Sequence, residues 1–144
     1  MKLNALIEEK NMSNPTVPPA RDSAKMWNVL CHASALTGLI IPLGFILGPL
    51  VVWSLKRGEY PSVDTNGKEA ANFQLSCLLY MLACFLVTAA VTFYLSSTTV
   101  IAIGHFFIGI IGLADIILII IASIKVSKGN TFRYPLTIRL ITTL

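Results

Sequence analysis

Two long stretches of this chain contain no Asp, Glu, Lys or Arg, and they constrain its fold more than any other feature. The first lies between Lys25 and Lys56, and the second lies between Glu69 and Asp115. A helix that spans a bilayer needs roughly 20 mainly apolar residues, so the second stretch holds most of two such helices. Only 12% of the residues are charged, whereas soluble domains usually carry about a quarter. We therefore expect an all-α, polytopic membrane protein whose partner is the lipid bilayer.

The chain divides into a flexible polar tail, residues 1–25, and a helical membrane domain, residues 26–144. Three apolar segments are expected in this domain, at about 27–55, 70–95 and 100–124. The first contains Pro42 and Pro49. Proline inside a helix removes a hydrogen bond and clashes with the preceding turn, so this segment is expected to break or to form a hairpin. Residues 125–144 form a polar C-terminal tail.

The two later segments are expected to be long antiparallel helices. The neutral turn at residues 96–99 is the only connection between them, and a connection this short makes them neighbours. Asn66 followed by Glu69 suits an N-cap with a capping box at the start of the first of these helices.

The distribution of basic residues predicts the topology. The N-terminal tail holds four Lys or Arg, the loop between the first two segments three, and the C-terminal tail four, while the turn at residues 96–99 holds none. Lys and Arg are enriched in cytoplasmic loops. If the first segment turns back on itself, all three basic regions share the cytoplasmic side. If it crosses once, the basic residues split four against seven, which makes the hairpin the preferred arrangement.

Asp115 is the most informative polar residue because it is expected near the middle of the last apolar segment. A carboxylate at that depth is costly and is usually buried, protonated or paired. It is either a hydrogen-bonded helix contact, which we favour, or a proton or cation site with His32 or His105 as its partner. Asn72 and Gln74 are the remaining candidate polar positions within the membrane.

Two patterns suggest contacts between helices. Asn72, Ser76 and Tyr80 fall four residues apart on one helix face, which favours interhelical hydrogen bonding over a water-accessible groove. A candidate packing face on the last helix consists of Gly104, Gly109 and Gly112. At 3.6 residues per turn these glycines cluster within about a third of the circumference, and small residues let a neighbouring helix approach closely.

No motif indicates catalysis, a cofactor or a metal site. His32 and Ser34 are two residues apart, so on a helix they point to different faces and do not form a base and nucleophile pair. The three cysteines lie inside apolar segments without a CxxC pair. The basic residues flank apolar segments and form no patch with interleaved aromatics, so nucleic acid is not an expected partner. We do not expect an enzyme.

Four ordered motifs carry a family resemblance. They are His32-x-Ser34 with Gly38, Pro42-Leu43-Gly44 through Gly48-Pro49-Leu50-Val51-Val52-Trp53, Gly67-Lys68-Glu69-Ala70-x-Asn72-Phe73-Gln74, and Arg133-Tyr134-Pro135-Leu136. Together they resemble the bacterial domain-of-unknown-function family 4870, which is distantly similar to the twenty-kilodalton Tic component of the chloroplast inner-envelope translocon. Phe45 departs from the pattern, where asparagine is expected after Pro-Leu-Gly.

The resemblance implies a small, multi-pass protein of the bacterial inner (cytoplasmic) membrane, and it implies no reaction. Our first hypothesis is a scaffold or accessory subunit that packs against other membrane proteins or copies of itself. The alternatives are a Tic-like translocation or conduction element, by analogy only, and a lipid-binding or ligand-binding membrane module.

Overall fold

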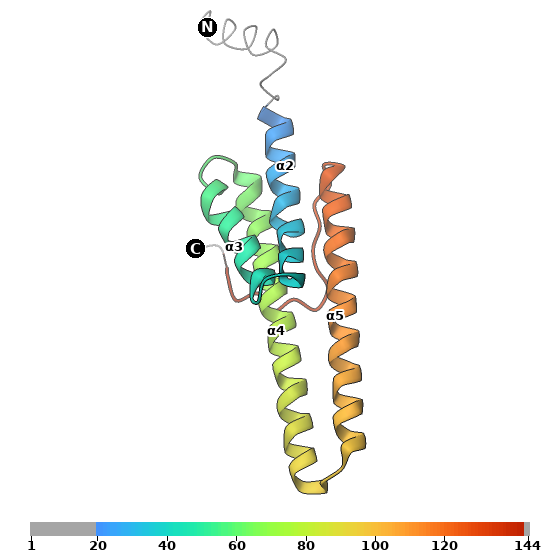
Figure 1. Ribbon diagram of the computed structural model, residues 1–144. Helices are drawn as coiled ribbons and strands as arrows, with labels where there is room; N and C mark the ends of the chain where they lie inside the picture. The colour runs from blue at the N-terminus through green and yellow to red at the C-terminus, as the bar shows by residue number, and fades with distance from the viewer. Residues whose placement is uncertain (1–19, 143–144) are drawn as a thin grey trace, which may run out of the picture.

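The computed structural model describes residues 20–142, and every regular element in this range is helical. In chain order the elements are α2 (Ala20–Ala33), the 3-10 helix η1 (Ser34–Leu39), α3 (Gly44–Lys56), α4 (Pro61–Leu95) and α5 (Thr98–Ser127). Figure 1 shows α4 and α5 as a long antiparallel pair. The expected all-α fold with two long antiparallel helices is confirmed.

The first apolar segment forms a helical hairpin, α2–η1–α3, that breaks next to Pro42. Leu43 adopts a left-handed backbone conformation with φ 62°. The Thr37 hydroxyl donates to the Ser34 carbonyl at 2.7 Å and lies 2.9 Å from the Gly44 carbonyl. A Cβ on Gly44 would lie 2.7 Å from the Thr37 carbonyl carbon, so only glycine permits the chain to close this tightly.

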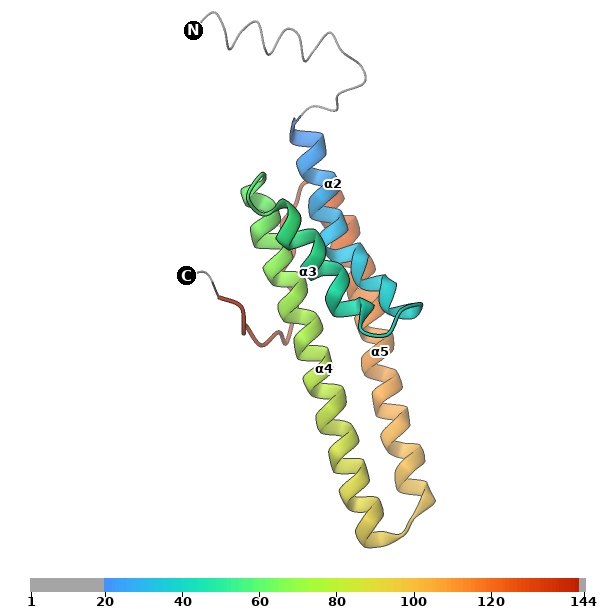
Figure 2. The ribbon, with the colours of Figure 1, turned by 60° about the vertical axis from the view of Figure 1, so that its left-hand side comes forward.

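The hairpin packs against one half of the α4–α5 pair and leaves the other half uncovered (Figure 2). α2 and α3 contain 14 and 13 residues, or about 20 Å each at ~1.5 Å per residue. α4 and α5 contain 35 and 30 residues, or roughly 50 and 45 Å. The α3 arm of the hairpin is thus too short to cross a hydrocarbon core of about 30 Å.

Several boundaries differ from those expected. α2 begins at Ala20 instead of after residue 25, and residues 1–19 of the expected tail lie outside the described range. α4 begins at Pro61, because proline has no N–H to lose and its fixed φ suits the first helical turn. The expected capping box at Asn66 is wrong, since Asn66 lies inside α4 and its amide donates to the Ser62 carbonyl at 2.8 Å.

The two ends of the molecule differ in charge. The start of α2, the α3–α4 loop and the end of α5 lie at one end, which we call the basic end, and the turn at residues 96–97 lies at the other (Figure 1). α4 and α5 are each long and apolar enough to cross a membrane, by length and composition.

The core lies where α4, α5 and the C-terminal segment meet. Its buried side chains are Phe73, Cys77, Ala122 and Tyr134, with Met81, Leu118 and Phe132 packed against them. On the other side of α4, Gly67 lets α3 approach, because a Cβ there would lie 2.5 Å from the Trp53 side chain. The Trp53 indole N–H donates to Asp64 Oδ1 at 2.8 Å.

Candidate functional site

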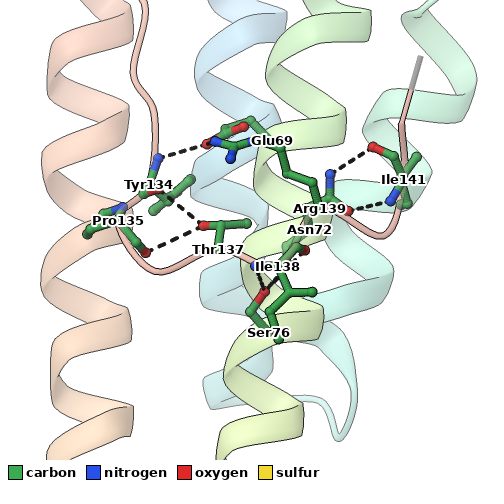
Figure 3. Close-up of polar contacts among 9 residues, drawn as sticks. All are labelled: Glu69, Asn72, Ser76, Tyr134, Pro135, Thr137, Ile138, Arg139 and Ile141. Atoms are coloured by element: carbon green, nitrogen blue, oxygen red, sulfur yellow. Dashed lines mark hydrogen bonds and ion pairs between the residues drawn. The ribbon is translucent and has the colours of Figure 1, made fainter.

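The C-terminal segment, residues 130–142, is irregular and lies across α4; we call it the strap. Figure 3 shows that it passes from the α5 side, at Tyr134, to the α3 side, at Ile141. It turns near Pro135, where Leu136 adopts a left-handed φ of 55°. Because an irregular segment has no helical or sheet partners for its main chain, its N–H and C=O groups need other partners.

One stripe of side chains on α4 supplies those partners. The Asn72 side-chain amide donates to the Ile141 carbonyl at 2.9 Å and its Oδ1 accepts from the Ile141 N–H at 2.7 Å. Ser76 Oγ accepts from the Ile138 N–H at 2.8 Å and donates to the Asn72 carbonyl at 2.7 Å. The Tyr80 hydroxyl donates to the Leu136 carbonyl at 2.6 Å. These three residues are the predicted stripe, but they bind backbone of the strap instead of another helix.

Glu69 extends the same stripe by one turn toward the basic end. Its Oε1 accepts from the Tyr134 N–H at 2.8 Å and lies 3.7 Å from an Arg139 guanidinium nitrogen (Figure 3). Positions 69, 72, 76 and 80 are spaced by three or four residues, so they share one helix face. The stripe therefore functions as a clamp for the strap.

Tyr134 connects the strap to α2 through a fully buried histidine. His32 is 0% exposed, with Nδ1 3.0 Å from the Tyr134 hydroxyl and Nε2 3.0 Å from Asn66 Oδ1. Because Asn66 Oδ1 only accepts, Nε2 carries the proton and the Tyr134 hydroxyl donates to Nδ1. Burial lowers the pKa of His32 and raises the pKa of Tyr134, so both groups stay neutral. The Tyr134 ring stacks on Phe73 with centroids 3.9 Å apart.

Asp115 bridges the two long helices. Gln74 Nε2 donates to Asp115 Oδ1 at 3.0 Å, and Cys77 Sγ lies 3.9 Å from the same oxygen. Gln74 Oε1 is buried and has no hydrogen-bond partner within the described residues. The structure therefore joins Gln74 to Asp115. It pairs His32 with Tyr134 and Asn66 instead of Asp115, while Nδ1 of the exposed His105 lies 2.8 Å from the Ile101 carbonyl on its own helix.

The predicted glycine face is used only in part within this chain. Gly104 is buried against the Thr88 side chain, which leaves no room for a Cβ. A Cβ on Gly109 or Gly112 would meet no atom of the described residues within 4 Å. Of the three predicted glycines, only Gly104 lies in the contact between α4 and α5.

Sequence reasoning missed Asn66, Glu69 and Tyr134 as members of the polar network. The only signal for Tyr134 was its position in the Arg133-Tyr134-Pro135-Leu136 motif. Within residues 20–142, no group of three or more His, Cys, Asp or Glu side chains is placed to hold a metal ion.

Most of the chain matches the model of one known protein family. The model of the magnetosome magnetite crystal formation protein family matches residues 23–141. The chain belongs to this family. The expected resemblance to domain-of-unknown-function family 4870 and to the Tic component is wrong. Its motifs mark the hairpin break and the strap contacts, which are requirements of packing and do not identify a function. No curated protein and no solved structure matches the chain.

Removing the clamp at Asn72 is expected to release the end of the strap. Asn72→Ala deletes both hydrogen bonds to Ile141, each worth on the order of 1 kcal/mol. The Ile141 amide should then exchange with solvent about tenfold faster or more in detergent-solubilised protein. Asn130→Ala is the matched control, since that side chain makes no hydrogen bond among the described residues. Unchanged exchange in Asn72→Ala would contradict the clamp.

Asp115 is expected to act as a helix contact. Asp115→Asn keeps an oxygen that accepts from Gln74, so it should preserve both thermal stability and function. Asp115→Leu should cost on the order of 0.6 to 2 kcal/mol, the range for polar contacts between membrane helices. Stability of the solubilised protein and complementation in magnetite-forming cells are the two measurements. An Asn variant that is stable but inactive would show that the titratable carboxyl is needed.

Proposed function

We propose that this protein is an integral membrane protein of the magnetosome that supports magnetite crystal formation as a scaffold or accessory subunit. The family match supports a role in the magnetosome. The exposed apolar surface of α4 and α5 supports insertion in a membrane. In this proposal it holds other membrane components in place and catalyses no reaction.

The halves of α4 and α5 beyond the hairpin expose large apolar side chains. They include Phe85, Leu86, Val87, Phe93, Tyr94, Leu95, Ile101, Ile103, Phe106, Phe107 and Ile110. Soluble monomers rarely expose contiguous apolar patches of more than a few hundred Å². Lipid tails cover such a surface without the cost of hydrating it, so the bilayer is the partner that this surface fits best.

The basic end suits the membrane interface. The Lys56 ammonium lies 4.9 Å from the ring centroid of Trp27, and the Arg57 guanidinium lies 4.9 Å from that of Trp53. Tryptophan is enriched at membrane–water interfaces, and Lys and Arg on the cytoplasmic side. We therefore place the basic end in the cytoplasm, with the hairpin entering the bilayer only part of the way.

The scaffold role rests on how the polar and small residues are used. His32, Asn72 and Asp115 each bond to groups of this chain, so they serve to hold its own structure together. Gly109 and Gly112 have open space beside them, which suits the close approach of a second membrane helix. The second helix belongs to another membrane protein or to another copy of this chain.

Single cysteines at Ser97, Ser62 and Thr142, in a background without the native cysteines, test the membrane placement. In intact spheroplasts of a host that forms no magnetosomes, where the protein would lie in the cytoplasmic membrane, an added impermeant maleimide should label Ser97→Cys. It should label Ser62→Cys and Thr142→Cys only after the membrane is permeabilised. Labelling of either of these from outside would overturn the topology.

Gly109→Leu tests the scaffold role. The variant should fold normally, because a Cβ at this position meets no described residue within 4 Å. It should reduce the mass of the detergent-solubilised assembly and alter crystal size in magnetite-forming cells. Ala114→Leu is the matched control: Ala114 is exposed and lies about 140° around the helix at ~100° per residue. Equal effects of the two variants, or none from Gly109→Leu, would count against a contact at this face.

A further inference from the structure

A polar cavity of about 230 Å³ lies at the basic end. It is formed by the start of α2, the first turns of α4, and the end of α5 with the turn that follows. Its polar lining includes Arg21, Lys25, Asn28, Ser62, Asn130 and Thr131. Its volume far exceeds the ~10–15 Å³ that one water needs. Two cavities in the other half of α4 and α5 are lined mainly by apolar side chains, whereas the polar lining of this cavity suits a polar ligand.

The charge of the cavity favours an anion. Arg21 and Lys25 line it, and none of the described residues that line it is a carboxylate. Asp22 lies 3.9 Å from the Lys25 ammonium, but the Lys25 and Asp22 side chains are 40% and 60% exposed, and ion pairs open to solvent contribute little. The Lys25 stem lies beside Gly129, with Cε 3.9 Å from where a Cβ would be, so this cation lies against the turn after α5.

The Asn28 side chain favours a ligand that carries a hydrogen-bond donor. Its Nδ2 donates to Ser62 Oγ at 3.0 Å. Its Oδ1 is buried and has no hydrogen-bond partner within the described residues. A buried acceptor without a partner is costly. Because Asn28 lines the cavity, a rotation of its side chain would bring Oδ1 to a ligand hydroxyl there.

We propose that this cavity binds a hydroxyl-bearing phosphate ester, as presented by a phosphatidylglycerol headgroup or by soluble glycerol phosphate. Arg21 and Lys25 contact the phosphate, and Asn28 Oδ1 accepts from a hydroxyl. Arginine and lysine both bind phosphate oxygens through charge-assisted hydrogen bonds. The headgroup as source rests on the proposed membrane placement, because the two tryptophans of the basic end would then bring the cavity to headgroup level.

The test uses the full chain purified in an uncharged detergent. Dissociation constants are measured for dihexanoyl phosphatidylglycerol, dihexanoyl phosphatidylcholine, dihexanoyl phosphatidic acid and glycerol 3-phosphate. Phosphatidylglycerol should bind at least tenfold more tightly than phosphatidylcholine. Arg21→Gln/Lys25→Gln should lose at least tenfold in that affinity, whereas Lys56→Gln/Arg57→Gln, which removes the same charge outside the cavity, should stay within about twofold of wild type.

Asn28→Ala separates the two contacts. It should weaken phosphatidylglycerol binding severalfold and leave phosphatidic acid, which has no headgroup hydroxyl, unchanged. If Arg21→Gln/Lys25→Gln does not fold, as judged by its melting midpoint without ligand, Asn28→Asp takes its place, because an added carboxylate should repel the phosphate and cause a similar loss.

Two outcomes support the site and show whether its ligand is a lipid or a soluble ester. Tight binding of phosphatidylglycerol without glycerol 3-phosphate indicates the lipid, while equal binding of both indicates a soluble ester. Equal affinity for phosphatidylglycerol and phosphatidylcholine, or equal loss in the two double variants, would overturn the proposal. None of these measurements depends on assembly or crystal growth, so failure here is distinct from failure of the scaffold role.

Discussion

Hydrogen bonds from one face of α4 to the main chain of the strap hold the polar half of this protein together. The strap is irregular, so its N–H and C=O groups have no helix or sheet to satisfy them. Glu69, Asn72, Ser76 and Tyr80 meet this need. Because the strap is bound, Tyr134 is held beside His32, and α2, α4 and the end of α5 are joined through one buried side chain. Without the clamp, the Tyr134 side chain would have no fixed position among these helices, which would still be joined by His32–Asn66 and Gln74–Asp115.

The molecule has two halves with different physical requirements. Near the basic end, the hairpin and the strap bury polar groups, and most of these have partners within the described residues, Asn28 Oδ1 and Gln74 Oε1 being exceptions. In the other half, α4 and α5 contact only each other and expose apolar side chains. The bilayer suits the half beyond the hairpin, because lipid covers apolar surface without hydration cost. The membrane–water interface suits the half near the basic end, because Lys and Arg gather there. The proposed membrane placement follows from this division, and the cavity beside Arg21 lies at the basic end, in the half that suits the interface.

Sequence reasoning predicted some contacts and missed others for identifiable reasons. Asp115 was expected to form a helix contact, and Gln74 provides it. His32 was considered as a partner for Asp115, but it bonds to Tyr134 and Asn66. The residues that line a pocket together with Asp115 are Ala35 and Leu36, one turn further along the chain. The stripe at Asn72 was visible as a periodic pattern, yet periodicity states which face is polar and does not state what covers it. The family resemblance was wrong. Its motifs correspond to the hairpin break and the strap contacts, which are requirements of packing and do not identify a function.

The sequence by itself determined the helical class, the break at Pro42 and the antiparallel pairing of the two long helices. These features are local: charge-free runs, the stereochemistry of proline and a short neutral turn act on residues close together in the chain. The tertiary structure decided the contacts of the strap. His32 meets Tyr134 across 102 positions and Asn72 meets Ile141 across 69. An irregular segment has no period from which its partner can be inferred, so only the folded chain shows that the polar face of α4 exists to bind it.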